Sequence, residues 1–268
     1  MKNKILVCGS LGFVLSNFIR FFLYRTKGYE IISIDNLENE QNSKHLYVHK
    51  NHSYSIGNIC DYEFMKKIIR LYEPDIIING VSCGKSLIER SDFIKGVSVL
   101  NSFNIPVIQL IPNLNCDESG MWKYVKNITN NLCIEFPNCF GRRQKTTQGI
   151  GYLIKEINSG LVSVSDKQIP WVYVEDVASL IWFCMEKEIK GLIKMPELGF
   201  ISTRQIAEYI KQRNNLNFEI TIDNEYWDGI CFNYKSELIN GWQPELEDLI
   251  ERIEETVRWY DANKWASV

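Results

Sequence analysis

The sequence lacks the features that mark several specialised classes of protein. None of its apolar runs reaches the roughly 18 residues that a membrane span requires. It has no run of basic residues, and its formal net charge is −3 over 268 residues. Neither a membrane nor a nucleic acid is therefore an expected partner. No linker, internal repeat or low-complexity tract divides the chain.

Cysteine pairs with the spacing of metal ligands are also missing. The eight cysteines are scattered without any CxxC spacing, and several lie inside apolar strands. A reduced cysteine in such a strand behaves as a small hydrophobic residue. Reduced thiols are typical of the cytoplasm, which is the compartment we expect.

Histidine is scarce, and its only three copies, His45, His49 and His52, form a cluster. Their spacing would let them meet on one helical turn and bind zinc, but no acid or cysteine completes a ligand set. A surface loop that follows a strand is the better interpretation, and no metal is expected. No histidine lies near a turn suited to a Ser-His-Asp or Cys-His nucleophile.

The composition, with 45% hydrophobic and 24% charged residues, is that of a globular protein. Short apolar runs alternate with segments of helical periodicity through the first half of the chain. Repeated βα units of this kind predict an α/β fold, a doubly wound (Rossmann-like) parallel sheet covered by helices on both faces. The predicted strands are 4–8, 30–34, 53–56, 75–78, 106–111 and 132–136, and the predicted helices are 16–24, 61–71 (capped by Asp61), 86–101 and 122–131.

The first βαβ unit has the pattern of a dinucleotide site. Gly9 can make the tight turn after the first strand, and Gly12 lets the backbone approach a diphosphate at the helix N-terminus. Asp35 follows the second strand, where an acid accepts hydrogen bonds from the adenosine ribose and repels the additional phosphate of NADP. NAD is therefore the expected cofactor. The third glycine position holds Leu15, which predicts a helix slightly further from the sheet.

Beyond Gly141 the alternation loosens into a smaller C-terminal α+β lobe. Its predicted helices are 150–158, 174–186, 203–213 and 245–263, and its predicted strands are 161–164, 192–195 and 219–222. We therefore expect an NAD-binding domain over residues 1–165 and a smaller substrate-binding lobe over residues 166–268, interwoven with the first.

Several weak motifs in one consistent order resemble the extended short-chain dehydrogenase/reductase family, in particular its nucleotide-sugar 4,6-dehydratases and epimerases. Gly9–Phe18 is similar to GGxGFIGSNF, and Gly57–Asp61 to GDIxD. The likeness continues over nearly the whole chain, with Glu73–Ile78 (RPDxVxH), Asn138–Gln144 (NVYGPRQ), Trp171–Asp176 (WxYVED), Leu238–Pro244 (LGWxP) and Val257–Tyr260 (TIxWY).

The resemblance implies a YxxxK pair, in which a lysine stabilises the phenolate that takes a proton from the sugar. Lys126 fits the lysine position, but Trp122 stands where the tyrosine is expected, and an indole cannot act as a base. The preceding strand also ends without Ser or Thr. Tyr124, or Asp117 or Glu118 as a shifted Thr-Asp-Glu motif, could serve instead. A charge pair at a helix N-terminus is the simpler interpretation of the two acids.

The implied cofactor residues are Gly9, Gly12, Phe13, Val14, Asp35, Asn36, Asn58, Ile59, Gly80 and Lys126. The arginine that usually binds the substrate phosphate is replaced by Ile169, so Lys167, Lys194, Arg142 or Arg143 would have to substitute, although each could equally be a solvated charge. The expected substrate residues are Asn138, Arg143 and Lys194.

Two functions remain open at this point. The first is an NAD-dependent enzyme that epimerises or dehydrates a UDP-, dTDP- or GDP-linked sugar, with Lys126, Tyr124, Asp117 and Glu118 as catalytic candidates. The second is a homologue that binds NAD or a sugar nucleotide and has a regulatory or scaffolding role. A homodimer is possible, but the helix that would form its interface is short.

Overall fold

The computed structural model describes residues 3–38, 44–81, 87–112, 121–129, 131–147, 149–213, 216–223, 234–245 and 248–263, apart from the side chains of residues 87–89, 121 and 122. The chain forms two compact units. The first holds the described residues of Met1–Ile111, Asp117–Glu135 and Ala178–Ile193. The second holds those of Pro112–Cys116, Phe136–Val177 and Lys194–Val268.

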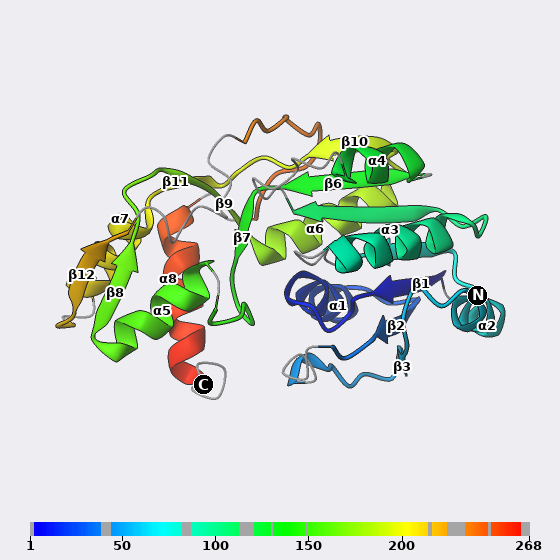
Figure 1. Ribbon diagram of the computed structural model, residues 1–268, viewed down its shortest axis with the longest axis horizontal. Coiled ribbons are helices and arrows are strands. Elements are labelled where there is room, and N and C mark those ends of the chain that lie inside the picture. The colour runs from blue at the N-terminus through cyan, green and yellow to red at the C-terminus, as the bar shows by residue number, and fades with distance from the viewer. Residues whose placement is uncertain are drawn as a thin grey trace. The chain divides into compact units, whose positions relative to one another are not determined.

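The first unit is built on a seven-stranded parallel sheet with the order β10-β6-β5-β4-β1-β2-β3 (Figure 1). Reversal of the strand order beside β1 is the doubly wound topology, in which ligands bind outside the carboxyl ends of the strands. The strands are β1 (Asn3–Cys8), β2 (Tyr29–Asp35), β3 (His52–Ile56), β4 (Ile76–Asn79), β5 (Val107–Pro112), β6 (Leu132–Phe136) and β10 (Gly191–Lys194).

Helices cover both faces of this sheet. On one face α2 (Tyr62–Tyr72), α3 (Leu87–Asn101) and α4 (Met121–Ile128) pack through two apolar clusters. On the other, α1 (Phe13–Arg25) meets α6 (Val174–Glu186), where the rings of Phe21 and Phe22 lie edge-on to Trp182. The Asp61 side chain caps α2 by accepting from the Phe64 amide at 3.0 Å, which confirms the predicted cap. The predicted α/β class is confirmed as well.

Within the described residues of the second unit, two small sheets pack with helices α5 (Gly149–Ser159), α7 (Thr203–Arg213) and α8 (Leu249–Ala262). β9 (Ile169–Tyr173) pairs in parallel with β7 (Asn138–Phe140) and antiparallel with β11 (Gly199–Ile201). β8 (Leu161–Val164) pairs in parallel with β12 (Glu219–Ile222). The three helices bury one apolar core with these strands. The strands β7, β9 and β11 were not predicted.

The boundary predicted between residues 165 and 166 falls inside the second unit. Pairing of β7 with β9 ties residues 138–140 to 169–173, so the segment before residue 165 packs with the segment after it. Conversely, the later part of α6 belongs to the first unit, where Trp182 packs on α1. The assignment of NAD to one domain and substrate to the other stays a prediction.

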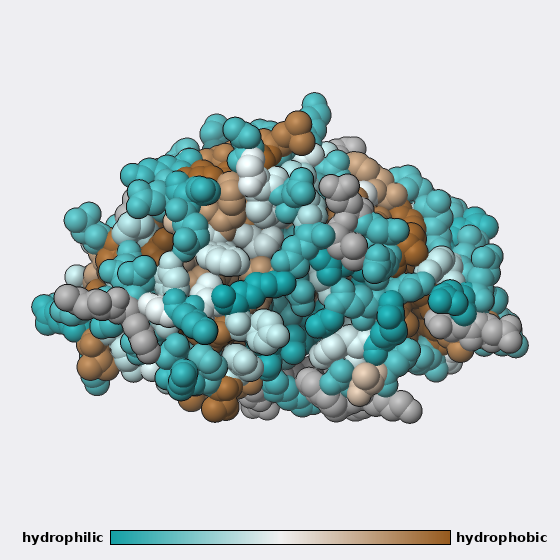
Figure 2. Space-filling view, turned by 180° about the vertical axis from the view of Figure 1, so that it is seen from behind, coloured by the Kyte–Doolittle hydropathy of each residue, from teal (hydrophilic) through white to brown (hydrophobic). Residues whose placement is uncertain are grey.

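Figure 2 shows mainly hydrophilic residues, with smaller hydrophobic areas among them, on the face turned away from the viewer in Figure 1. Among the residues that the structure describes, no helix has the length and apolar character of a membrane span.

Candidate functional site

The turn after β1 has a backbone that only glycine adopts easily. Gly9 has a φ of +74°, and its amide donates to the Ile34 carbonyl of β2 at 2.9 Å. A Cβ added there would lie 3.0 Å from the backbone nitrogen of Val81. The first predicted glycine is thus required by both conformation and space.

The first turn of α1 follows directly. Gly12 is the N-cap residue, with an extended backbone and no side-chain cap, so the first amides of α1 are not taken by a capping side chain. Unsatisfied amides and the helix dipole together attract an anion such as a diphosphate. Gly12 lies close to the Gly9 carbonyl, since a Cβ there would be 3.1 Å from that oxygen. This donor set fits the diphosphate of a dinucleotide, and the contact of the Phe13 and Val14 amides with it stays a prediction.

Asp35 joins the end of β2 to the glycine turn. Its Oδ2 accepts from the Leu11 amide at 3.0 Å, and its Oδ1 accepts from the Leu37 amide at 3.1 Å. The side chain is 8% exposed. Each carboxylate oxygen has two lone pairs, so these bonds leave acceptor capacity for ribose hydroxyls. Burial, with Asp35 as the smaller cause, raises the pKa of the neighbouring Cys8 thiol to about 12, which disfavours the reactive thiolate.

Leu15, at the third glycine position, is buried against a glycine on the sheet. A Cβ added at Gly80 would lie 2.5 Å from Leu15 Cδ1, so the space that a side chain at Gly80 would fill is occupied by leucine. Gly80 therefore lies beneath α1, and its predicted contact with the cofactor stays a prediction.

The remaining cofactor candidates make local contacts. Asn36 Oδ1 accepts from the Glu38 amide at 3.3 Å, and Asn58 Oδ1 accepts from the Cys60 amide at 2.9 Å. The Ile59 side chain is buried in the apolar cluster between α2, α3 and the sheet. Ile59 would thus offer backbone groups alone to a ligand, and the roles of all three stay predictions.

Lys126 lies on α4 and forms an ion pair with a carboxylate that was not predicted as part of the site. Its Nζ donates to Glu135 Oε2 of β6 at 2.6 Å. Tyr124, two positions earlier on the same helix, is 47% exposed. The helix turns by about 200° over two residues, so Tyr124 and Lys126 face different sides. The backbone of Trp122 lies on α4, and Asp117 and Glu118 lie outside the described residues.

A second polar pair that was not predicted joins the end of β4 to the middle of β5. Asn79 Nδ2 donates to Gln109 Oε1 at 2.8 Å, and both side chains are fully buried. Like Glu135, these residues are polar positions in otherwise apolar strands, and this pattern in the sequence could have identified them as candidate functional residues. Gln109 lies in the middle of β5, and the strand ends at Ile111 and Pro112 without the Ser or Thr that the resemblance implies.

The predicted substrate residues lie in the second unit, each with a partner of its own. Asn138 Nδ2 donates to the Pro170 carbonyl at 3.0 Å. Arg143, with a φ of +68°, lies over the Trp259 ring at 5.6 Å. Lys194 Nζ is 3.8 Å from Glu237 Oε1. Each therefore has a partner within the chain, and binding of substrate stays a prediction.

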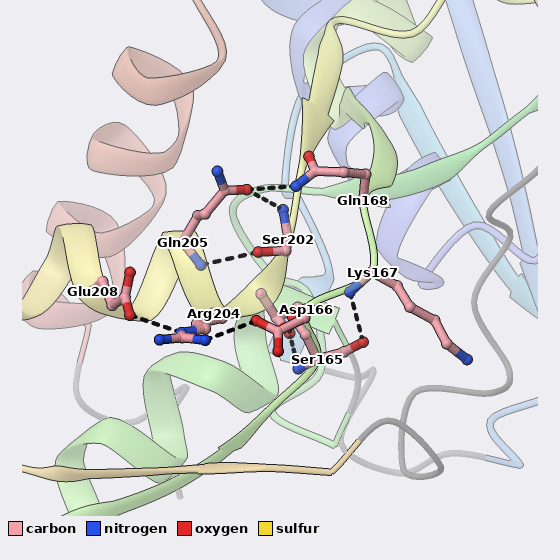
Figure 3. Close-up of polar contacts among 9 residues, drawn as sticks. Ser165, Asp166, Lys167, Gln168, Ser202, Arg204, Gln205 and Glu208 are labelled. Atoms are coloured by element: carbon pink, nitrogen blue, oxygen red, sulfur yellow. Dashed lines mark hydrogen bonds and ion pairs between the residues drawn. The ribbon is translucent and has the colours of Figure 1, made fainter.

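Lys167 lies beside a polar cluster at the start of α7 (Figure 3). Ser202 and Gln205 form a reciprocal cap of this helix, with bonds of 3.0 and 3.1 Å, and Arg204 bridges Asp166 and Glu208. The Lys167 side chain extends away from this cluster (Figure 3).

Arg142, the other candidate cation, is part of a charged network in the second unit. It pairs with Glu175 and Glu255, and Glu255 also pairs with Arg252. Arg252 is 3.6 Å from Asp176. These contacts connect α8 to Arg142 and to the start of α6, and a contact of Arg142 with a substrate stays a prediction.

The three histidines do not converge on a common point. His45 Nδ1 contacts the Leu11 carbonyl at 2.9 Å, whereas His49 stacks on Tyr47. His52 Nδ1 donates to the Tyr47 carbonyl, while its Nε2 accepts from Ser33. Burial lowers the pKa of His52, which favours this neutral form. In the part of the chain that the structure describes, no group of three metal-ligating side chains is found.

The described geometry defines a Rossmann-like α/β protein with a second, smaller unit. Three solved structures share this fold over 97–99% of both chains. They are the dTDP-glucose 4,6-dehydratases from Streptomyces venezuelae (15% identity, TM-score 0.82) and Bacillus anthracis (17%, 0.77), and the UDP-glucose 4-epimerase from Thermotoga maritima (17%, 0.77). Both dehydratase structures contain NAD, and the epimerase structure contains UDP-glucose.

No family model and no curated protein sequence matches the chain. At these identities, the structural likeness establishes the fold.

Proposed function

We propose that this protein binds NAD in its first unit and acts on a nucleotide-linked sugar as an epimerase or dehydratase. The observation that carries the proposal is the turn of Gly9 and Gly12, to which Asp35 of β2 is joined through the Leu11 amide. It combines a backbone cradle, uncapped helix amides and a buried carboxylate at the carboxyl ends of β1 and β2. The fold shared with NAD-bound sugar-nucleotide enzymes supports it.

Four residues of the first unit have specific roles in this proposal. The amides of Phe13 and Val14 hold the diphosphate, Asp35 accepts from the adenosine ribose, and Lys126 donates to the nicotinamide ribose. When bound, NAD would accept a hydride from a sugar carbon transiently. Asn138, Arg143 and Lys194 are the proposed substrate residues of the second unit.

Proton transfer is the step for which this chain departs most from the YxxxK scheme. Because position 122 is tryptophan, we propose that Tyr124, Asp117 or Glu118 takes the proton from the sugar. Loss of a positioned general base costs a factor of about 10² to 10⁴ in rate, so slow turnover is the expected result.

The test is incubation of the protein with NAD and a panel of UDP-, dTDP- and GDP-sugars, followed by mass spectrometry and analysis of the sugar configuration. Loss of one water, or inversion at the sugar's C4, supports the proposal. Trp122→Tyr should raise the rate, and Trp122→Phe serves as its matched control. If the wild type and both variants leave every sugar unchanged but bind NAD tightly, the protein is a binding protein and not an enzyme.

A further inference from the structure

Glu135 is the only charged residue in β6, where all five side chains are buried. Its own side chain is 9% exposed. A carboxylate at such a depth is costly unless it is paired, so its partner determines why it is tolerated. That partner is Lys126, at 2.6 Å.

The contact follows from how α4 packs on the sheet. Val125 of α4 and Cys133 of β6 belong to one apolar cluster, which fixes the helix over the strand. Cys133 and Glu135 are two residues apart on β6, and therefore point to the same face. Glu135 consequently lies under α4 near the carboxyl end of its strand, where Lys126 reaches it.

The pair carries no net charge, although each member does. Glu135 takes one of the three donors of the ammonium group and thereby orients it. A lysine that is 29% exposed would otherwise have several rotamers and an uncompensated positive charge. Glu135 thus sets both the position of Lys126 and the electrostatic potential around it.

We propose that Glu135 is a positioning residue that balances the charge of Lys126, and that the pair sets the preference of the site for oxidised or reduced cofactor. The inference rests on the proposed function, which places Lys126 beside the nicotinamide ribose. The nicotinamide ring is cationic in NAD⁺ and neutral in NADH. A neutral pair of Lys126 and Glu135 allows the cationic ring of NAD⁺ to bind, whereas an ammonium group without its carboxylate would repel that ring.

The test is the ratio of the dissociation constants of NAD⁺ and NADH, measured by calorimetry on the full chain. Glu135→Gln should raise this ratio about tenfold, because one positive charge near the ring is no longer offset. Lys126→Met should lower it, because the carboxylate then attracts the cationic ring. A change of folding alone would not shift the ratio in opposite directions.

Two control variants complete the design. Lys126→Arg keeps the charge and should leave the ratio close to that of the wild type. Glu208→Gln removes the carboxylate of another close ion pair, 2.8 Å from Arg204 on α7, and should leave the ratio unchanged. If Lys126→Met does not fold, Glu135→Gln decides alone, since glutamine has nearly the size of glutamate and its amide oxygen can still accept from Lys126.

The outcomes separate the two proposals. If the wild type binds both cofactors but Glu135→Gln leaves their ratio unchanged, this inference is wrong and the proposed function stands. If the wild type binds neither cofactor, the proposed function fails, and this inference fails with it.

Discussion

Gly9 is a position of the proposed site at which the structure does not tolerate a side chain. Its left-handed φ and the nearby backbone nitrogen of Val81 exclude a side chain on two independent grounds. Gly28, before β2, also has a positive φ, of +94°, but no atom lies within 4 Å of an added Cβ. A substitution at Gly28 therefore measures conformational strain alone, whereas one at Gly9 measures strain together with a steric contact.

Gly9→Ala should lower the free energy of unfolding by about 2–3 kcal/mol, and Gly28→Ala by about 1 kcal/mol, because only the first adds a contact to strain. Urea denaturation measures both. Gly9→Ala should also weaken NADH binding, whereas Gly28→Ala should not. Equal losses of stability would show that the contact with Val81 relaxes at no cost.

At the scale of elements, α1 packs on the end of β4 with a large side chain on the helix opposite a glycine that follows the strand. The helix carries a leucine where the dinucleotide pattern has its third glycine, and the sheet carries Gly80 opposite it. The side chain of Leu15 is thereby buried in place of the close contact between helix and sheet that a glycine would permit.

The double variant Leu15→Ala/Gly80→Ala tests this packing. Leu15→Ala alone should cost about 2–4 kcal/mol through a cavity, and Gly80→Ala alone about 1–3 kcal/mol through overpacking. Because the alanine at position 80 fills the space that leucine leaves, the double variant should cost at least about 1 kcal/mol less than the sum. Additive values from denaturation curves would rule out direct packing.

Most elements of four or more residues were predictable from their own sequence, whereas the three-residue strands were not. The strand of residues 132–136 and the helix of residues 203–213 have the predicted bounds. β7 and β11 have three residues each and owe their existence to pairing with β9, which lies distant in sequence. A three-residue segment has too few side chains to establish a period, so the tertiary contact decides it.

The site was predictable where the backbone defines it. Gly9, Gly12 and Asp35 follow from local spacing, and the structure joins Asp35 to the turn of the two glycines through the Leu11 amide. The partners of Lys126 and Asn79 depend instead on which strands become neighbours. Glu135 and Gln109 were visible as polar residues inside apolar runs, but their contacts become evident only after α4 and β5 are in place.

At the scale of the whole molecule, the charge network around α8 links stability to pH. Burial raises the pKa of Asp176 to about 6, although Arg252 opposes this shift. The folded chain therefore binds a proton more tightly than the unfolded chain does. Stability contributed by this group is lost as the pH rises through about 6, and is present at lower pH.

Relative to Asp176→Asn, the wild type should gain about 1 kcal/mol of unfolding free energy between about pH 7.5 and about pH 5. Denaturation of both proteins in the same buffers measures this difference. Carboxylates common to both proteins cancel in the comparison. Parallel curves at the two pH values would show that Asp176 titrates alike in the folded and unfolded chains.

Binding of the cofactor is the claim on which the rest depends, and calorimetric titration with NADH tests it most directly. We predict saturable binding, weaker binding of NADPH because of the Asp35 charge, and loss of NADH binding in Asp35→Ala but not in Asp92→Ala, which changes an exposed acid on α3 of the same unit. No saturation of the wild type with either NADH or NAD⁺ would contradict the account.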